Sequence, residues 1–140
     1  PFIAKWPAKI EAAAASSATI NFTDMFSTFA EMLDADMSSY VSVKDSESFY
    51  AQLLEPAKER MRGPMINGSY SIREGDWKIG AKSRGAMKKI EAKQLAAAQF
   101  ELHNLEEDLA ESKDLSEQEP EKVKGLLEKL GAFVAERELK

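Results

Sequence analysis

A one-sided apolar stripe near the end of the chain constrains the fold more than any other sequence feature. Five residues carry it at helical spacing, with charged residues between them: Val123, Leu126, Leu127, Leu130 and Val134. Such a stripe predicts an amphipathic helix, which must bury one face against another element. Ser116 and Glu119 have the spacing of a capping box and Pro120 suits a first turn, so these residues mark the start of the helix. We expect the helix to end near Glu138.

The residues before this helix change to a period of two, which is typical of strands. Tyr70 and Ile72 alternate with polar residues, Glu74-Gly75 supplies a turn, and Trp77 and Ile79 continue beyond it. This pattern predicts a β-hairpin. A third strand is expected around Phe100, Leu102 and Leu105, followed by an acidic loop over residues 106–116. The predicted fold class is therefore α+β, with a small antiparallel sheet packed against a long C-terminal helix.

The first third of the chain has a different pattern of apolar residues. Phe2, Ile3 and Ala4, with Trp6, form a short apolar run closed by Pro7, which favours a buried strand. A helix is expected from Asp24 to Leu33, where Thr23 can act as its cap. Five apolar residues are expected to share one face of that helix: Met25, Phe26, Phe29, Met32 and Leu33. Residues 34–48 should form a loop, and residues 49–54 a short helix that ends near Pro56.

Composition excludes several classes of protein. The 140 residues are 44% hydrophobic, which suffices for one ordinary core, and the net charge of −5 disfavours a nucleic-acid partner. No apolar run approaches the roughly 18 residues that span a bilayer, so no membrane partner is expected. The chain has no cysteine, which removes disulfides, thiolate metal sites and cysteine nucleophiles.

Four segments in order resemble the sulfatase family. The first is the run from Pro1 to Ile10, and the second is the helix from Phe22 to Ala30. The third is the hairpin Ile72-Arg73-Glu74-Gly75-Asp76-Trp77-Lys78, and the fourth runs from Leu102 to Leu115. Further details resemble the bacterial arylsulfatase-type members most: Asp45-Ser46, Asn67-Gly68-Ser69-Tyr70 and Glu119-Pro120-Glu121.

This resemblance implies that residues 1–140 are the C-terminal region of a sulfatase. Residues 1–56 would be the tail of its large α/β domain, and residues 57–140 its C-terminal subdomain with the hairpin and terminal helix. The resemblance also implies a calcium ion and a formylglycine nucleophile, both held by parts of the family outside this segment. Members of the family are commonly exported to the periplasm or outside the cell, but the sequence does not fix the location of this chain.

No residue is assigned a catalytic or metal-binding role, and no substrate-binding residue is identified. The nearest serine pattern to a formylglycine motif, Ser16-Ser17-Ala18, is followed by Ile20 where the family requires arginine. Gly63, Pro64 and Met65 stand where bacterial relatives often carry a His-Ser pair that faces the substrate. The isolated chain is therefore expected to be inactive towards sulfate esters.

Several residues allow both a functional and a structural interpretation, and the structural one is favoured for all of them except Arg73, for which the two are equal. His103 could be a base or ligand but falls at a strand end. Asp34, Asp36 and Asp45 lack the spacing of a calcium loop. Trp77 and Tyr70 could stack on a sugar, but a hairpin usually places such residues under a helix. Arg73 is the polar residue of most functional interest, but a salt bridge beneath the sheet explains it equally well. An exposed basic excursion is expected at Lys82, Arg84, Lys88, Lys89 and Lys93.

Two functions remain open from sequence. One is a sulfatase C-terminal fragment that contributes scaffold and active-site wall, with an N-terminal catalytic portion or a second copy of itself as partner. The other is a free-standing binding or interaction module that uses the Trp77 hairpin or the basic excursion for a ligand.

Overall fold

The computed structural model describes residues 2–37, 45–67, 70–83 and 96–138. The chain forms two compact units, Pro1–Arg62 and Gly63–Lys140, which we call the first and second unit. Helices and a small antiparallel sheet are both present, and the α+β class predicted from the sequence is confirmed. The assignment of the first unit to the tail of a larger α/β domain stays a prediction.

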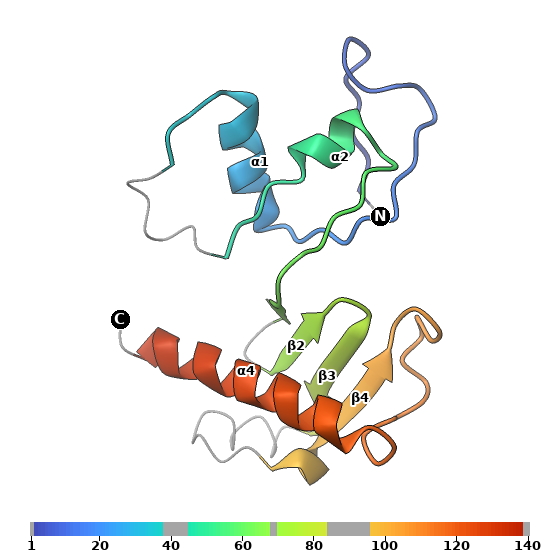
Figure 1. The fold of residues 1–140 in the computed structure, drawn as a ribbon, viewed down its shortest axis with the longest axis vertical. Helices are drawn as coiled ribbons and strands as arrows, with labels where there is room; N and C mark the ends of the chain where they lie inside the picture. The colour runs from blue at the N-terminus through green and yellow to red at the C-terminus, as the bar shows by residue number, and fades with distance from the viewer. Residues whose placement is uncertain (1, 38–44, 68–69, 84–95, 139–140) are drawn as a thin grey trace. The chain divides into compact units, whose positions relative to one another are not determined.

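The second unit is built on a four-stranded antiparallel sheet in the order β1-β2-β3-β4 (Figure 1). The strands are β1 (Met65–Asn67), β2 (Ser71–Glu74), β3 (Trp77–Ala81) and β4 (Phe100–Asn104). Glu74 pairs with Trp77, so the predicted hairpin is confirmed, and Gly75 occupies the turn at φ 56°, where a side chain would be strained. The sequence missed β1, because three residues are too few to display an alternating pattern.

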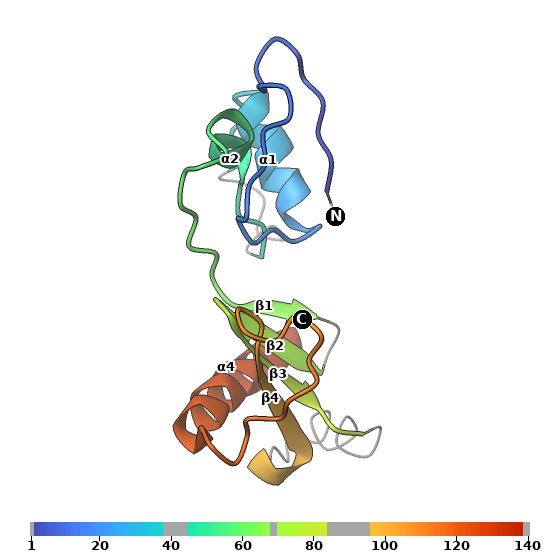
Figure 2. The same ribbon diagram turned by 90° about the vertical axis from the view of Figure 1, so that its right-hand side faces the viewer.

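One long helix, α4 (Pro120–Glu138), covers a face of this sheet (Figures 1 and 2). Eight buried residues from both elements form the core of the unit: Ile72, Ile79, Phe100, Leu102, Val123, Leu126, Leu127 and Leu130. The predicted stripe, first-turn proline and helix end are confirmed. The predicted capping box is wrong, because the helix begins four residues after Ser116, whose N–H instead donates to the Asp114 carboxylate at 2.8 Å. A single 3-10 turn, η2 (Ala97–Gln99), precedes β4.

Two carboxylates hold the acidic loop between β4 and α4 in place. Asp108 accepts the backbone N–H groups of Ser112 and Lys113 at 2.7 and 2.8 Å. Asp114 accepts the Leu102 N–H at 3.1 Å and forms an ion pair with Lys82 at 2.8 Å. The predicted loop over residues 106–116 is therefore held in a defined conformation by hydrogen bonds to the carboxylates of Asp108 and Asp114.

The described residues of the first unit contain two helices, α1 (Asp24–Met32) and α2 (Tyr50–Leu54). Both helices were predicted. The strand predicted for residues 2–4 is wrong: the segment is not in a sheet, and Ile3 is 88% exposed. A strand requires a partner for its backbone groups, and the described part of the first unit contains no other strand.

Some predicted features fall outside the described residues. These include the apolar residues of the 34–48 loop, namely Tyr40, Val41 and Val43, and most of the basic excursion, namely Arg84, Lys88, Lys89 and Lys93. Within the part of the chain that the structure describes, no helix combines the length and apolar character that crossing a membrane requires.

Candidate functional site

A buried carboxylate organises the first unit. Asp24, the first residue of α1, is fully buried and faces two arginines from the segment that closes the unit. Arg60 Nη2 lies 3.0 Å from its Oδ2, and Arg62 Nη2 lies 2.9 Å from its Oδ1. Both arginine side chains are themselves buried, so this is a desolvated ion-pair cluster rather than a surface one.

Backbone groups complete the coordination of Asp24. The N–H of Asn21 donates to Oδ2 at 3.0 Å and the N–H of Glu47 donates to Oδ1 at 3.1 Å. Burial alone would raise the pKa of the Asp24 carboxyl, but the hydrogen bonds from Arg62, Glu47, Asn21 and Arg60 outweigh it, so the pKa lies below its usual value. Asp24 is therefore a carboxylate at neutral pH, and Arg60 and Arg62 balance its negative charge.

The arginines also bind carbonyl oxygens of distant segments. Arg60 donates to the carbonyls of Glu47 and Thr19, and Arg62 donates to that of Asp45. Arg62 further pairs with the Glu47 carboxylate at 2.8 Å. The cluster thus joins the start of α1, the turn before it, the 45–49 segment and the end of the unit. The sequence reasoning gave no role to either arginine; the only signal was their i, i+2 spacing.

The cluster sets which side of α1 faces inward. Asp24 and Thr28 are buried one turn apart, and Thr28 Oγ1 both donates to the Asp24 carbonyl and accepts the Phe49 N–H. The predicted apolar face of α1 is therefore not the buried one: Phe26 and Phe29 are half-exposed and Leu33 is 78% exposed. Thr23 is the N-cap residue, but its side chain makes no capping hydrogen bond. Charge pairing inside the unit outweighs apolar burial in orienting this helix.

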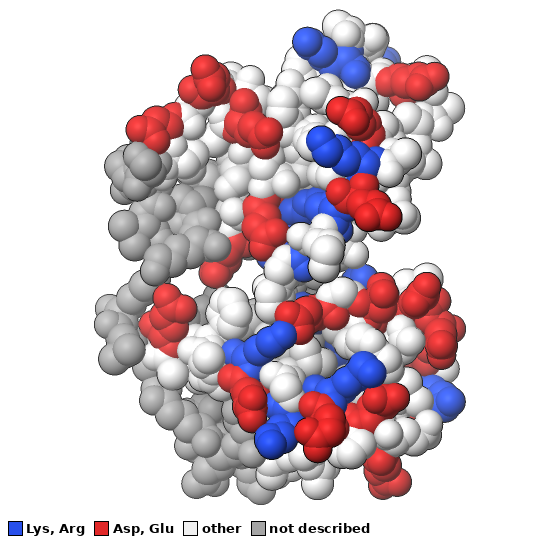
Figure 3. Space-filling view, in the orientation of Figure 1, with Lys and Arg blue, Asp and Glu red and all other residues white. Residues whose placement is uncertain are grey.

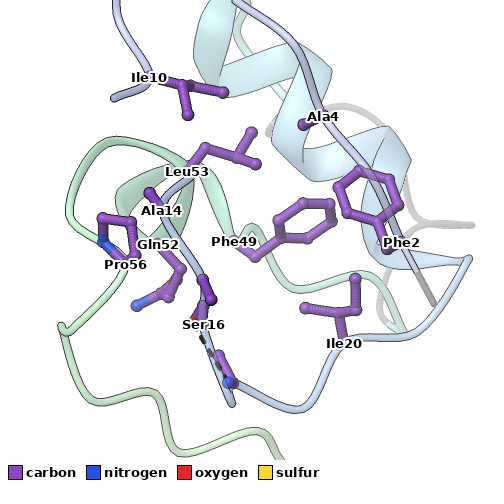
Figure 4. A pocket seen from close by; sticks show the side chains of 12 residues that line it. Phe2, Ala4, Ile10, Ala14, Ser16, Ile20, Phe49, Gln52, Leu53 and Pro56 are labelled. Carbon is purple, nitrogen blue, oxygen red and sulfur yellow. Dashed lines mark hydrogen bonds between the residues drawn. The ribbon is translucent and has the colours of Figure 1, made fainter. Parts of the chain in front are cut away.

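Two hollows adjoin α1 and α2, of which the first is mainly apolar and the second is of mixed character. One, of about 320 Å³, is lined by the N-terminal segment and by α1, including Phe2, Trp6, Met25 and Phe29. The other, of about 360 Å³, lies around Phe49 and Leu53 and contains the side chains of Ser16 and Gln52 (Figure 4). Phe2 lines both hollows. Its ring stands edge-on to the Phe49 ring, with centroids 5.4 Å apart.

The residues singled out from sequence do not gather at these hollows. His103 is buried in β4, and its Nδ1 lies 2.9 Å from the Lys113 carbonyl oxygen. Tyr70 and Trp77 pack against the core of the second unit, and the Lys122 ammonium lies 4.3 Å from the Trp77 ring centre. Arg73 Nε donates to the Gly75 carbonyl at 2.8 Å, and Met65 is buried in β1. These positions agree with the structural interpretations.

The described residues offer no site for a metal ion. Among them, no three His, Cys, Asp or Glu side chains come together in a way that could hold one. Asp45 uses its carbonyl oxygen to accept Arg62, and Asp34 is an exposed residue in the left-handed region, at φ 51°. Asp24, the one fully buried carboxylate in the described part of the chain, is neutralised by arginines. The calcium ion implied by the family resemblance does not fit the residues described in this chain.

Exposed large apolar side chains are distributed unevenly between the units. In the part of the chain that the structure describes, eight belong to the first unit: Phe2, Ile3, Phe22, Phe26, Phe29, Leu33, Leu54 and Met61. The second unit has one, Leu109. Over α4 the surface instead carries acidic and basic side chains close together (Figure 3). Contiguous exposed apolar patches mark sites that interact with proteins, membranes or ligands.

Comparison with known proteins places the fold. No protein-family model and no curated protein matches the chain. A solved structure described as "Metabolism of multiple glycosaminoglycans by bacteroides thetaiotaomicron is orchestrated by a versatile core genetic locus (BT33336S-sulf)" matches 93% of this chain, with a TM-score of 0.68 and 21% sequence identity. The match covers 28% of that protein, so this chain spans less than a third of its length. The chain therefore shares the fold of the part of that protein that it matches.

Proposed function

We propose that this chain is the C-terminal scaffold portion of a sulfatase, a sulfuric ester hydrolase of the bacterial arylsulfatase type. In this proposal the chain forms part of the wall of the active site, and a catalytic portion supplies the formylglycine nucleophile and the calcium ion. The observation that carries the proposal is the uneven exposure of apolar side chains. The second unit buries a complete apolar core, whereas the first leaves eight large apolar residues uncovered among those described.

The chemistry of the chain supports a scaffold role. Sulfate-ester hydrolysis needs a nucleophile and a group that stabilises the charge of the sulfate. The chain has no cysteine to convert, and Ser16 Oγ accepts the N–H of Ala18 in an exposed turn. Arg60 and Arg62, which could have bound a sulfate, are engaged by Asp24. The charged groups of the first unit are therefore used to shape the unit rather than to bind an anion.

The alternative of a free-standing binding module draws less support from the geometry. Trp77 was its proposed stacking platform, but this side chain packs against the core and has an ammonium group above its ring. A sugar would have to displace Lys122 to stack there. The basic excursion lies largely outside the described residues and gives this alternative no structural support.

An antibody against the α4 sequence can test the scaffold proposal in the source organism. The immunopurified native species should exceed 15.6 kDa, the mass of this chain, and should hydrolyse 4-nitrophenyl sulfate in the presence of calcium. The purified recombinant chain should show no turnover above the buffer rate. A native species of 15.6 kDa that is monomeric and inactive would overturn the proposal and favour the binding module. Turnover by the recombinant chain that persists on repurification would contradict it as well.

A further inference from the structure

We propose that the acidic loop between β4 and α4, residues 106–116, is an autoinhibitory strap. It occupies the outer edge of β4, and its release opens that edge to β4 of a second copy of the chain. The side chain of Asp114 holds the strap in place. Every residue involved belongs to the second unit, so the strap is independent of the proposed function.

The sheet of the second unit has two edges, and β4 forms the longer one. It is the last strand in the order β1-β2-β3-β4 and pairs with β3 on one side. An edge strand presents N–H and C=O groups that can pair with another chain, and natural proteins shorten or cover such edges. The opposite edge, β1, has three residues, whereas β4 has five. The edge of β4 therefore has the greater need of a cover.

The strap satisfies backbone groups that point outward from β4. The Leu102 N–H donates to Asp114 Oδ1 at 3.1 Å, and the Leu102 carbonyl accepts the Leu115 N–H at 2.8 Å. The Asn104 carbonyl accepts the Asp108 N–H at 2.9 Å. Alternate residues of an antiparallel strand direct their backbone groups to the same edge, as residues 102 and 104 do here. The loop thus occupies the place that a further strand would take, beside β4 (Figure 1).

The carboxylate of Asp114 joins three parts of the unit. In addition to the Leu102 N–H, its Oδ1 accepts the Ser116 N–H at 2.8 Å, and its Oδ2 pairs with the Lys82 ammonium at 2.8 Å. Lys82 directly follows β3, so one side chain connects β3, β4 and the loop. Hydrogen bonds to an ionised group are stronger than those between neutral groups. Removal of this carboxylate should therefore loosen the strap and free the Leu102 N–H.

The uncovered edge of β4 would be complementary to itself. Two copies that pair antiparallel about Leu102 place Glu101 of each copy opposite His103 of the other. Glu101 and His103 share one face of the sheet, since Oε2 and Nε2 lie 3.5 Å apart within the chain. His103 Nδ1 lies 2.9 Å from the Lys113 carbonyl oxygen, which can only accept, so Nδ1 carries the proton.

Release of the strap frees this Nδ1–H for the Glu101 carboxylate of the second copy. Acid and base groups that lie opposite each other stabilise paired strands. A two-fold symmetric contact forms both of these pairs at once, and the two Leu102 residues exchange their backbone hydrogen bonds. A second copy therefore fits the edge that the strap covers.

A single substitution in the full chain tests the strap. Asp114→Ala should give a species of twice the mass of the unaltered chain, which is 15.6 kDa for a monomer, with a dissociation constant at least about tenfold lower. Glu107→Ala, which removes an exposed carboxylate from the same loop, is the matched control and should leave the mass unchanged. Light scattering after gel filtration measures the masses. All three chains carry the same first unit, so association through that unit would be common to them.

Amide exchange locates the contact. In the dilute Asp114→Ala variant the Leu102 amide should exchange at least about tenfold faster than in the unaltered chain, and it should slow as the concentration rises. The amide of Ile79, in β3, should not respond to concentration. Glu101→Ala added to this variant should raise the dissociation constant of the dimer by about fivefold, because it removes the acid from both cross-strand pairs.

Circular dichroism checks that each variant is folded. If Asp114→Ala unfolds, Asp114→Asn replaces it, because asparagine keeps the shape of the side chain and removes its charge towards Lys82. Folded variants that associate no more than the Glu107→Ala control would overturn the proposal. Association that leaves Leu102 exchange independent of concentration would place the contact elsewhere and overturn it too. Unfolding of both variants would show that Asp114 is needed for the fold itself and would likewise contradict an autoinhibitory role.

Discussion

The two compact units of this chain bury opposite kinds of side chain. The second unit encloses eight apolar residues between a sheet and a helix and keeps its charges outside. The first unit encloses a carboxylate and two guanidinium groups beside Phe49 and leaves eight of its described large apolar residues exposed. An apolar core is stabilised by the loss of contact with water, whereas a buried ion pair depends on every partner being present. The difference indicates that the second unit is stabilised by an apolar core of its own, whereas the first unit depends on its buried charge cluster.

Removing the central charge should produce the largest effect, confined to the first unit. Asp24→Asn leaves the buried Arg60 without its counter-charge and Arg62 with only the Glu47 carboxylate, and loss of one partner from a buried pair costs about 3–5 kcal/mol. We expect amide exchange to accelerate throughout α1 and to stay unchanged in β3 and β4. Asp34→Asn, at an exposed position in the left-handed region that asparagine tolerates, is the matched control and should change stability by less than about 0.5 kcal/mol. An equal response of both units would show that they fold as one.

A cavity in the apolar core should give the converse result. Leu130 is fully buried between α4 and the sheet, so Leu130→Ala should cost about 2–5 kcal/mol of unfolding free energy. The expected measurement is faster native-state amide exchange at Ile79 and Leu102, with α1 unaffected. Leu109→Ala, at an exposed position in the same unit, is the control. A cost below about 1 kcal/mol for Leu130→Ala would mean that the helix does not dock as described.

Low pH should destabilise the first unit before the apolar core of the second unit in the unaltered chain. The folded pKa of Asp24 lies below its ordinary value of 3.8, so the ion-pair stabilisation is fully present above about pH 4 and is lost as the pH falls through the folded pKa. Burial opposes the lowering of the Asp114 pKa, but hydrogen bonds from Lys82, Ser116 and Leu102 dominate, so the loop before α4 should loosen in the same range. The apolar core does not titrate. Amide exchange between pH 5 and pH 2, corrected for intrinsic rates, should show α1 and this loop opening before β3, β4 and α4. Loss of the sheet first would contradict this order.

The smallest expected effect concerns the surface of the second unit. Lys122 lies above the Trp77 ring and also pairs with Glu119 at 3.1 Å, both at an exposed position. Lys122→Ala should cost about 0.5–1 kcal/mol, because exposed cation–π contacts and surface ion pairs are weak. Urea denaturation measures the difference, with the exposed Lys124→Ala as control. A cost similar to that of Leu130→Ala would mean that surface charges, and not the apolar core, stabilise this unit.

The sequence was most informative where neighbouring residues decide the structure. The alternation around Ile72 and Ile79, the glycine at the turn and the stripe from Val123 to Leu130 each follow a local period of two or 3.6 residues. Hairpin, helix and core could be predicted from these periods, because a period specifies both the element and the side that it buries. The short strand β1 could not, since three residues carry too little pattern.

The same reasoning failed for α1, because its burial is decided over long distances along the chain. The helix itself was predicted, and its apolar side was expected to face inward. Asp24 meets Arg60 and Arg62 across 36 and 38 residues, and nothing in the local sequence links these positions. Only the tertiary structure brings the three charges together. Once these charges are buried they must remain paired, and this requirement leaves Phe26, Phe29 and Leu33 on the exposed side of α1.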